Sequence, residues 1–293
     1  MILFVEAVPF ILVAISSVSH ATWNYMAKGS SVRLAFIWLM NLTSQLTFLP
    51  FFIIYMSDWS VPWSVLPLLL ASSIAELIYF LALSRAYDVG DLSLVYPLAR
   101  SSPLFVAVLS VLILGEMISF WGIAGILLII FGVYTLHLRS FRIKEMLMPL
   151  RSVRDKASQL ALLAALGTTA YSLIDSRGVS MIDPIRYNFW LEIFLTLMLT
   201  PFTLKGGAGV AAGTWRNQGF RALVSGILMR GGYILVLVAM TMAPVSYILA
   251  IRQVSIVMGA LLGVAILKDR YGRMRLLSSS IIFVGVYILG ALA

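Results

Sequence analysis

Ten apolar runs, each close to the length of about 20 residues that a helix needs to cross a bilayer, divide this chain of 293 residues. In a lipid core every backbone N–H and C=O must be bonded within the protein, so only helices and closed barrels can span it. The runs are too long for barrel strands and do not alternate. We therefore predict an all-α integral membrane protein with ten spans, at about 4–27, 34–56, 63–86, 92–114, 117–137, 158–177, 185–204, 219–242, 245–267 and 276–292.

Composition supports this interpretation, since 61% of the residues are hydrophobic and only 11% are charged. A soluble domain is about 45–50% apolar and about 25% charged, which excludes a cytosolic enzyme, a secreted domain and a disordered chain. The net charge of +9 comes from basic residues scattered through short gaps, whereas nucleic-acid binding needs a folded basic face. We expect the lipid bilayer, and no nucleic acid, as a partner. The lack of cysteine excludes disulfides and thiolate metal sites.

A basic linker divides the chain into two halves. The longest polar stretch, residues 138–157, carries six Lys or Arg residues against two acidic ones. It separates a first five-helix repeat, 1–137, from a second, 158–293. An odd number of helices per half places the second half upside down relative to the first. The predicted architecture is therefore two inverted five-helix repeats.

Alignment of the two halves supports an internal repeat. At an offset of about 152–154 residues, Arg100 meets Arg252 and Tyr79 meets Tyr233. Loops on the linker side contain sixteen Lys or Arg residues, and the opposite loops contain two. The positive-inside rule then places the linker in the cytoplasm and both termini outside.

Short motifs in the first half suggest a family. The stretch before the linker resembles the helix 4–5 hairpin of the EamA family, which belongs to the drug/metabolite transporter superfamily. The matching residues are Tyr96-Pro97, Leu114-Gly115-Glu116, Trp121 to Gly125, and Phe131-Gly132-Val133-Tyr134, with Trp23-Asn24 and Lys28 fitting the family's first helix. The second half departs from the pattern, because Lys268-Asp269 stands where Gly-Glu or Lys-Glu is usual.

The resemblance covers the whole chain and implies a carrier of small metabolites. Members are similar in often exporting amino acids, so export is the direction that the resemblance implies. Many members are drawn with both termini in the cytoplasm, which conflicts with the charge count above. We expect helices 1, 3, 4, 6, 8 and 9 to supply the cavity walls. The resemblance also implies that the last helix pair of each half, 4–5 and 9–10, acts as a scaffold or rocks against the other helices.

Five ionisable residues fall near the middle of their predicted spans: Glu76, Arg100, Glu192, Arg230 and Arg252. Each costs about 2.5–3.5 kcal/mol on insertion scales, so five facing lipid would cost roughly 12–17 kcal/mol. That sum exceeds the stability of many folds. These side chains are therefore expected to face one wet interior cavity.

Arg100 and Arg252 are our candidates for an anion site, because guanidinium groups bind carboxylate or phosphate through paired hydrogen bonds. Packing against carbonyl groups and a gating role are the alternatives. Glu76 and Arg230, at equivalent positions in the two halves, are expected to form a structural ion pair. Either Glu76 or Glu192 could instead carry a coupling proton.

Polar and aromatic residues on the same helix faces complete the candidate substrate site. His20 could relay a proton or be a hydrogen-bonded core residue. The remaining candidates are Tyr79, Tyr96, Tyr233, Trp23 and Asn24. No nucleotide-binding, zincin or hydrolase motif is present, and Asp175 is predicted to lie alone at a helix end. We therefore expect no catalytic residue, metal or cofactor.

These observations predict secondary transport by alternating access. An excess of positive charge in the cavity favours a small anionic or zwitterionic substrate, such as an amino acid, carboxylate or phosphate ester. The expected location is the plasma membrane, which is the inner membrane of a bacterium, and the protein is expected to be a monomer or homodimer. A non-transporting membrane sensor or scaffold, and a membrane-embedded enzyme acting on lipid, are the alternatives from other classes.

Overall fold

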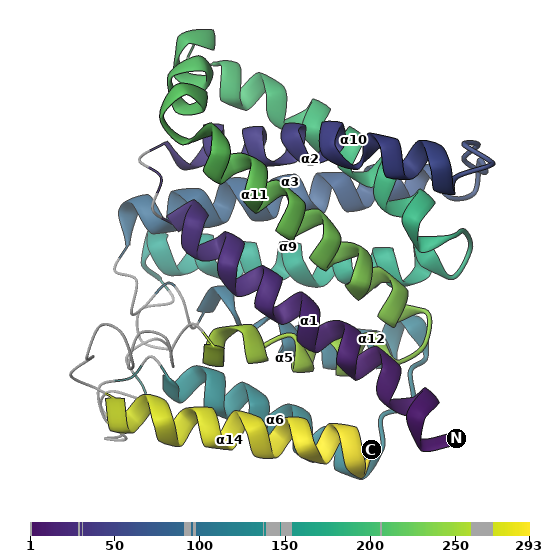
Figure 1. The fold of residues 1–293 in the computed structure, drawn as a ribbon. Coiled ribbons are helices and arrows are strands. Elements are labelled where there is room, and N and C mark those ends of the chain that lie inside the picture. Colours follow the sequence, from purple (N-terminus) through teal and green to yellow (C-terminus); the bar gives the residue numbers. More distant parts are fainter. Residues whose placement is uncertain are drawn as a thin grey trace.

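The computed structural model of this chain is a bundle of helices packed side by side (Figure 1). It describes residues 2–28, 30, 32–90, 95, 98–136, 138, 147, 154–205, 207–258 and 272–293. Within these ranges there is no β-strand, which confirms the prediction of an all-α protein.

The described helices follow the predicted spans. The first half contains α1 (Ile2–Lys28), α2 (Arg33–Tyr55), α3 (Leu66–Val89), α5 (Ser102–Leu109) continued by the π-helical turn η1 (Ser110–Leu114), and α6 (Phe120–Leu136). The second half contains α9 (Lys156–Val179), α10 (Pro184–Leu204), α11 (Ala208–Met240), α12 (Val245–Ile251) and α14 (Gly272–Ala291). Among the described residues, five helices are long and apolar enough to cross a membrane, at 33–55, 66–89, 156–179, 208–240 and 273–291.

Two spans differ from their predicted limits. Helix α11 begins at Ala208, nearly three turns before its break at Gln218, where φ is −138°, and its apolar part follows that break. The segment before Gln218 does not form an apolar run, because glycine and polar side chains interrupt it. The predicted span at 245–267 is helical only to Ile251 before its first interruption. Residues 92–94, 96, 97, 137 and 259–267 of the predicted spans lie outside the described residues.

Local sequence explains several helix ends. Asp183 begins α10, and its Oδ1 accepts hydrogen bonds from the backbone N–H groups of Ile185 and Arg186. Pro184, which has no N–H to leave unbonded, occupies the first helical position. Gly115 ends η1 with φ at +70°, a conformation that glycine adopts without steric cost.

The main contacts between helices are those expected for an internal repeat. Helix α3 packs on α9, and α1 packs on α11, which is the same pairing after the two halves are exchanged (Figure 1). Helices α6 and α14 form a further pair and run in opposite directions. Gly125 and Gly285 allow their close approach, because a Cβ on either would lie within 2.9 Å of the other's carbonyl oxygen.

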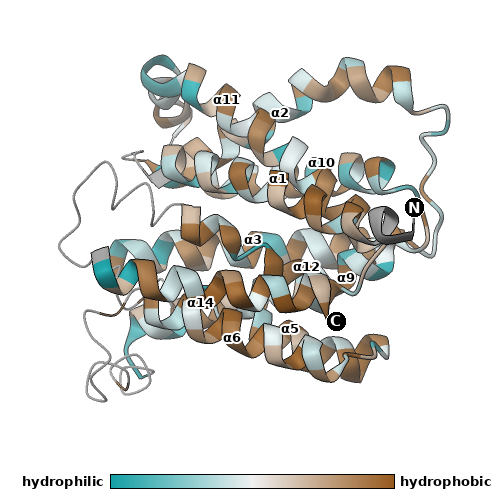
Figure 2. Ribbon diagram, turned by 60° about the horizontal axis from the view of Figure 1, so that its bottom comes forward, coloured by the Kyte–Doolittle hydropathy of each residue, from teal (hydrophilic) through white to brown (hydrophobic). Residues whose placement is uncertain are grey.

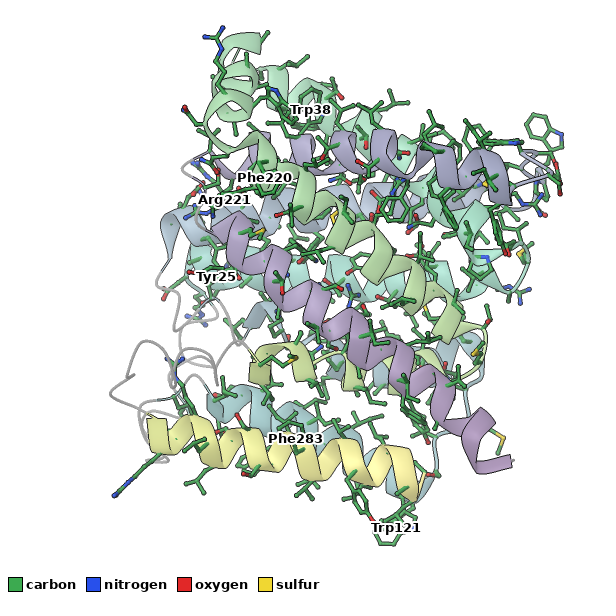
Figure 3. The ribbon with its side chains drawn as sticks, in the orientation of Figure 1. Tyr25, Trp38, Trp121, Phe220, Arg221 and Phe283 are labelled. Atoms are coloured by element: carbon green, nitrogen blue, oxygen red, sulfur yellow. The ribbon has the colours of Figure 1, made fainter. Side chains whose placement is uncertain are left out.

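The surface of the bundle suits a lipid solvent. Large apolar side chains are exposed on α5, α6 and α14, among them Leu104, Leu127 and Val284. Hydrophobic residues predominate along α5 and α6 (Figure 2). Trp121 on α6 points away from the bundle (Figure 3), and Phe283 on α14 is 48% exposed. Both chain termini lie at one end of the bundle, and the helix ends that flank the linker lie at the other (Figure 1). This is the arrangement that an odd number of spans per half requires.

Candidate functional site

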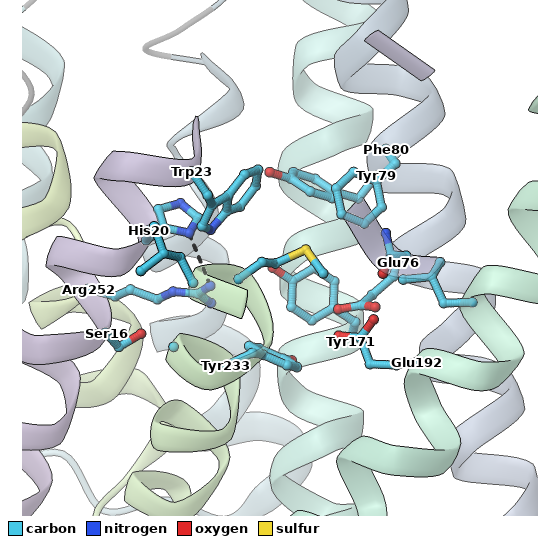
Figure 4. A pocket seen from close by; sticks show the side chains of 15 residues that line it. Ser16, His20, Trp23, Glu76, Tyr79, Phe80, Tyr171, Glu192, Tyr233 and Arg252 are labelled. Atoms are coloured by element: carbon cyan, nitrogen blue, oxygen red, sulfur yellow. Dashed lines mark hydrogen bonds between the residues drawn. The ribbon is translucent and has the colours of Figure 1, made fainter. Parts of the chain in front are cut away.

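Two adjoining cavities lie inside the bundle. The central cavity, about 490 Å³ including its mouth, is lined by residues of α1, α2, α3, α9, α10 and α11 and by Arg252 (Figure 4). The second cavity, about 420 Å³ again including its mouth, contains Arg100 in its wall. Four residues line both cavities and form the boundary between them: His20, Tyr79, Tyr171 and Arg252.

The two candidate arginines meet at a single histidine. Arg100 Nη1 lies 3.2 Å from His20 Nε2, and Arg252 Nη2 lies 3.4 Å from His20 Nδ1. A neutral imidazole has one acceptor nitrogen, whereas guanidinium groups only donate. His20 can therefore accept from one arginine at a time, and the facing N–H of the other needs a different acceptor. The ring of Trp23 lies edge-on to His20, with the ring centres 5.0 Å apart.

Both arginines lie at interruptions of their helices rather than within regular helix. Arg100 stands two residues before α5, which begins at Ser102 with Pro103 in its first turn. Arg252 directly follows the last residue of α12. Helix breaks of this kind are common at the binding sites of transporters, because the freed backbone groups can line a cavity. The guanidinium of Arg252 also lies 5.5 Å from the ring centre of Tyr233.

The central cavity contains two carboxyl groups opposite Arg252. Glu76 on α3 and Glu192 on α10 are 7% and 3% exposed, and the Oε2 atom of each is buried without a hydrogen-bond partner. Among the described residues, neither forms an ion pair within 4 Å. The expected excess of positive charge is therefore not a property of the central cavity. The second cavity has that excess, with Arg100 and Arg252 in its described wall and no carboxyl group there.

The expected ion pair between Glu76 and Arg230 is not formed. Arg230 is fully buried, donates from Nη1 to Gln45 Oε1 at 2.9 Å, and lies 5.3 Å from the ring centre of Phe52. It lines neither cavity. Tyr233, three residues later on α11, does line the central cavity. On a helix of 3.6 residues per turn, positions 230 and 233 point in directions about 60° apart, which explains why only Tyr233 reaches the cavity.

The described structure corrects the prediction for Asp175. This residue is fully buried on α9 and does not stand alone at a helix end. Its Oδ1 accepts from Ser72 Oγ at 2.5 Å and from the Tyr187 hydroxyl at 2.8 Å, and its Oδ2 accepts from the Tyr233 hydroxyl. One carboxylate thus holds α3, α10 and α11 against α9.

The remaining candidates are distributed as follows. Trp23 lines the central cavity, as expected. Asn24 donates from Nδ2 to the carbonyl of His20 at 2.8 Å and lines neither cavity. Tyr96 lies outside the described residues. Asn41 of α2 also lines the central cavity. It was not predicted from the sequence, because helix 2 was not expected to form a wall.

Comparison with known proteins agrees with this architecture. The model of the EamA-like transporter family matches residues 8–138 and again residues 156–291. This chain belongs to the EamA-like transporter family. The family is part of the drug/metabolite transporter superfamily, and its two matched units end and begin at the basic linker. Membership and the apolar helices together make this EamA-like protein an integral membrane protein of a transporter family.

A solved crystal structure shares the fold of this EamA-like protein. The two have a TM-score of 0.69 over 99% of each chain, with 14% sequence identity. At that identity the similarity concerns the fold alone. No curated protein matches the sequence.

Proposed function

We propose that this EamA-like protein is a secondary transporter that moves a small metabolite with an anionic group by alternating access. The anion site is the pair Arg100 and Arg252 with His20 between them. The observation that carries this proposal is that an arginine from each half reaches the same imidazole and lines the same cavity. The sensor and lipid-enzyme alternatives do not explain why each half contributes an arginine to one enclosed space.

The chemistry of the site favours an anion. Two guanidinium groups in one cavity repel one another and cannot both donate to a neutral His20. A carboxylate or phosphate between them offers acceptor atoms to both and offsets the repulsion. The helix breaks at both arginines support movement, since discontinuous helices form the sites around which the halves of many transporters rock.

The remaining parts of the proposal concern orientation and direction. The two family units are arranged as inverted repeats, the linker side faces the cytoplasm, and the physiological direction is export. The carboxyl groups of Glu76 and Glu192 are available for exchange of a coupling proton, because ionisable groups inside membranes commonly mark such pathways.

The experiment is transport into vesicles made with purified protein, using labelled amino acids, dicarboxylates and phosphate esters as probes. We compare R100Q and R252Q with R177Q, a matched control because Arg177 lies at the end of α9 and outside both cavities. Loss of one charge-assisted hydrogen bond of about 1.5–3 kcal/mol predicts a 10- to 100-fold weaker apparent affinity. Unchanged transport by both R100Q and R252Q would remove the anion site.

A further inference from the structure

Three residues that line the central cavity have buried acceptor oxygens without a donor. Glu76 Oε2, Glu192 Oε2 and Asn41 Oδ1 are buried without a hydrogen-bond partner, and all three residues line this cavity. They come from three different helices, α3, α10 and α2. Asn41 is fully buried and already donates from Nδ2 to the carbonyl of Ile37 at 3.0 Å, which identifies its oxygen as the unbonded end.

Three such acceptors in one place indicate the chemistry of a ligand. A buried acceptor left unbonded costs about 1–3 kcal/mol, and more for a charged group. A ligand that satisfies them must bring several N–H donors and a positive charge. A primary ammonium group brings three donors and no acceptor, which matches the three unbonded oxygens.

The rest of the cavity wall suits a cation as well. The rings of Tyr79, Phe80 and Tyr171 line the same space (Figure 4), and the faces of aromatic rings attract cations. Arg252 enters the cavity from the side opposite Glu76 and Glu192, with Tyr171 between them (Figure 4). Positive and acceptor-rich walls therefore face one another across the cavity.

We propose that Asn41, Glu76 and Glu192 form an ammonium site, and that the substrate is a zwitterion in which a short chain separates a primary ammonium group from the anionic group. The substrate lies in the central cavity, with its ammonium group at the ammonium site and its anionic group bound by Arg252. This proposal rests on the proposed anion site, and its test separates the two.

The test uses binding to purified protein in detergent, in sodium-free buffer, with three probes of equal chain length. 6-Aminohexanoate carries separated charges, norleucine carries adjacent charges, and hexanoate carries no ammonium group. We expect 6-aminohexanoate to bind most tightly at millimolar concentration. E76Q and E192Q should each weaken its binding about 10- to 100-fold, the loss of a charge-assisted bond, and should leave hexanoate binding equal or stronger.

Control variants make the outcomes distinct. D155N removes an exposed carboxylate outside the cavity and should change neither probe. Retained hexanoate binding shows that E76Q and E192Q are folded. If R252Q weakens both probes while E76Q and E192Q leave 6-aminohexanoate unchanged, the ammonium site is wrong and the anion site stands. If neither R100Q nor R252Q weakens binding of either probe, the anion site fails.

Other results also overturn the ammonium site. One is equal binding of hexanoate and 6-aminohexanoate by the unmodified protein, and another is no binding of 6-aminohexanoate at millimolar concentration. Preference for norleucine would refute the separated charges. Binding of sodium, instead of an ammonium group, by Glu76 and Glu192 would also overturn the proposal. In that case sodium chloride, but not choline chloride, would raise the melting temperature in a manner lost in E76Q, without any probe present.

Discussion

Asp175 supports the clearest prediction about stability. Its fully buried carboxylate accepts hydrogen bonds from the hydroxyl groups of Ser72, Tyr187 and Tyr233, which lie on three other helices. D175A would leave three buried donors without an acceptor. At about 1–3 kcal/mol for each unbonded group, and with some relief as the hydroxyls rotate, the expected loss is about 3–5 kcal/mol. D175N keeps one acceptor oxygen and should lose about half as much.

Thermal unfolding in detergent, followed by the fluorescence of the seven tryptophans, measures this loss. For a chain of this size about 1 kcal/mol corresponds to 2–4 °C, so D175A should melt about 6–20 °C below the unmodified protein. S72A and Y187F each remove one donor while the carboxylate keeps its other partners, so each should cost only about 1 kcal/mol. A D175A protein that melts within about 2 °C of the unmodified one would refute the reasoning.

Three further predictions concern contacts away from the cavities. Glu116 accepts hydrogen bonds from the first N–H groups of α12, so E116A should lower stability by about 1–2 kcal/mol in the same assay, and no change would show that the cap is dispensable. A Cβ at Gly226 would lie 2.4 Å from a backbone oxygen of α2, so G226A should destabilise by about 1–3 kcal/mol. G213A, with open space around it in the same helix, should be neutral or stabilising, and equal melting temperatures for the two variants would contradict the packing argument. Hydrogen bonds from Ser60 lower the pKa of Asp58, so its stabilising contribution is present above the unfolded value near pH 4 and is lost as the pH falls through the lower folded value. D58N should therefore remove part of the loss of stability below about pH 4, measured as melting temperature against pH.

The sequence was sufficient to predict where the described helices lie, because lipid imposes a strong length requirement on apolar runs. It did not predict the early start of α11 or the end of α12 at Ile251. The start of α11 was missed because the segment before Gln218 has no apolar run of its own. The end of α12 was missed because Arg252 lies at the boundary of two cavities that other helices form. The cost of placing a charge in a membrane correctly indicated that Arg252 faces the interior, but could not show that the helix stops there.

The candidate site was predictable in part for the same reason. The energetic cost of burial correctly placed Glu76 and Glu192 in a shared cavity. The same cost placed Arg230 inside the protein, but could not show that its partner would be Gln45 instead of Glu76. Asp175 was missed because its donors lie 12, 58 and 103 residues away along the chain, and no pattern within one helix reveals them.

The distribution of the site between the two family units has a mechanistic consequence. Arg100 and Glu76 lie in the unit 8–138, and Arg252 and Glu192 lie in the unit 156–291. A conformational change is driven by a ligand only if the ligand binds the two states with different free energies. When two units that each supply one cation and one carboxyl group move relative to one another, the separations within both pairs change together. Under the proposed mechanism, a substrate that touches both units would bind conformations that differ in these separations with different free energies, which is what coupling its binding to alternating access requires.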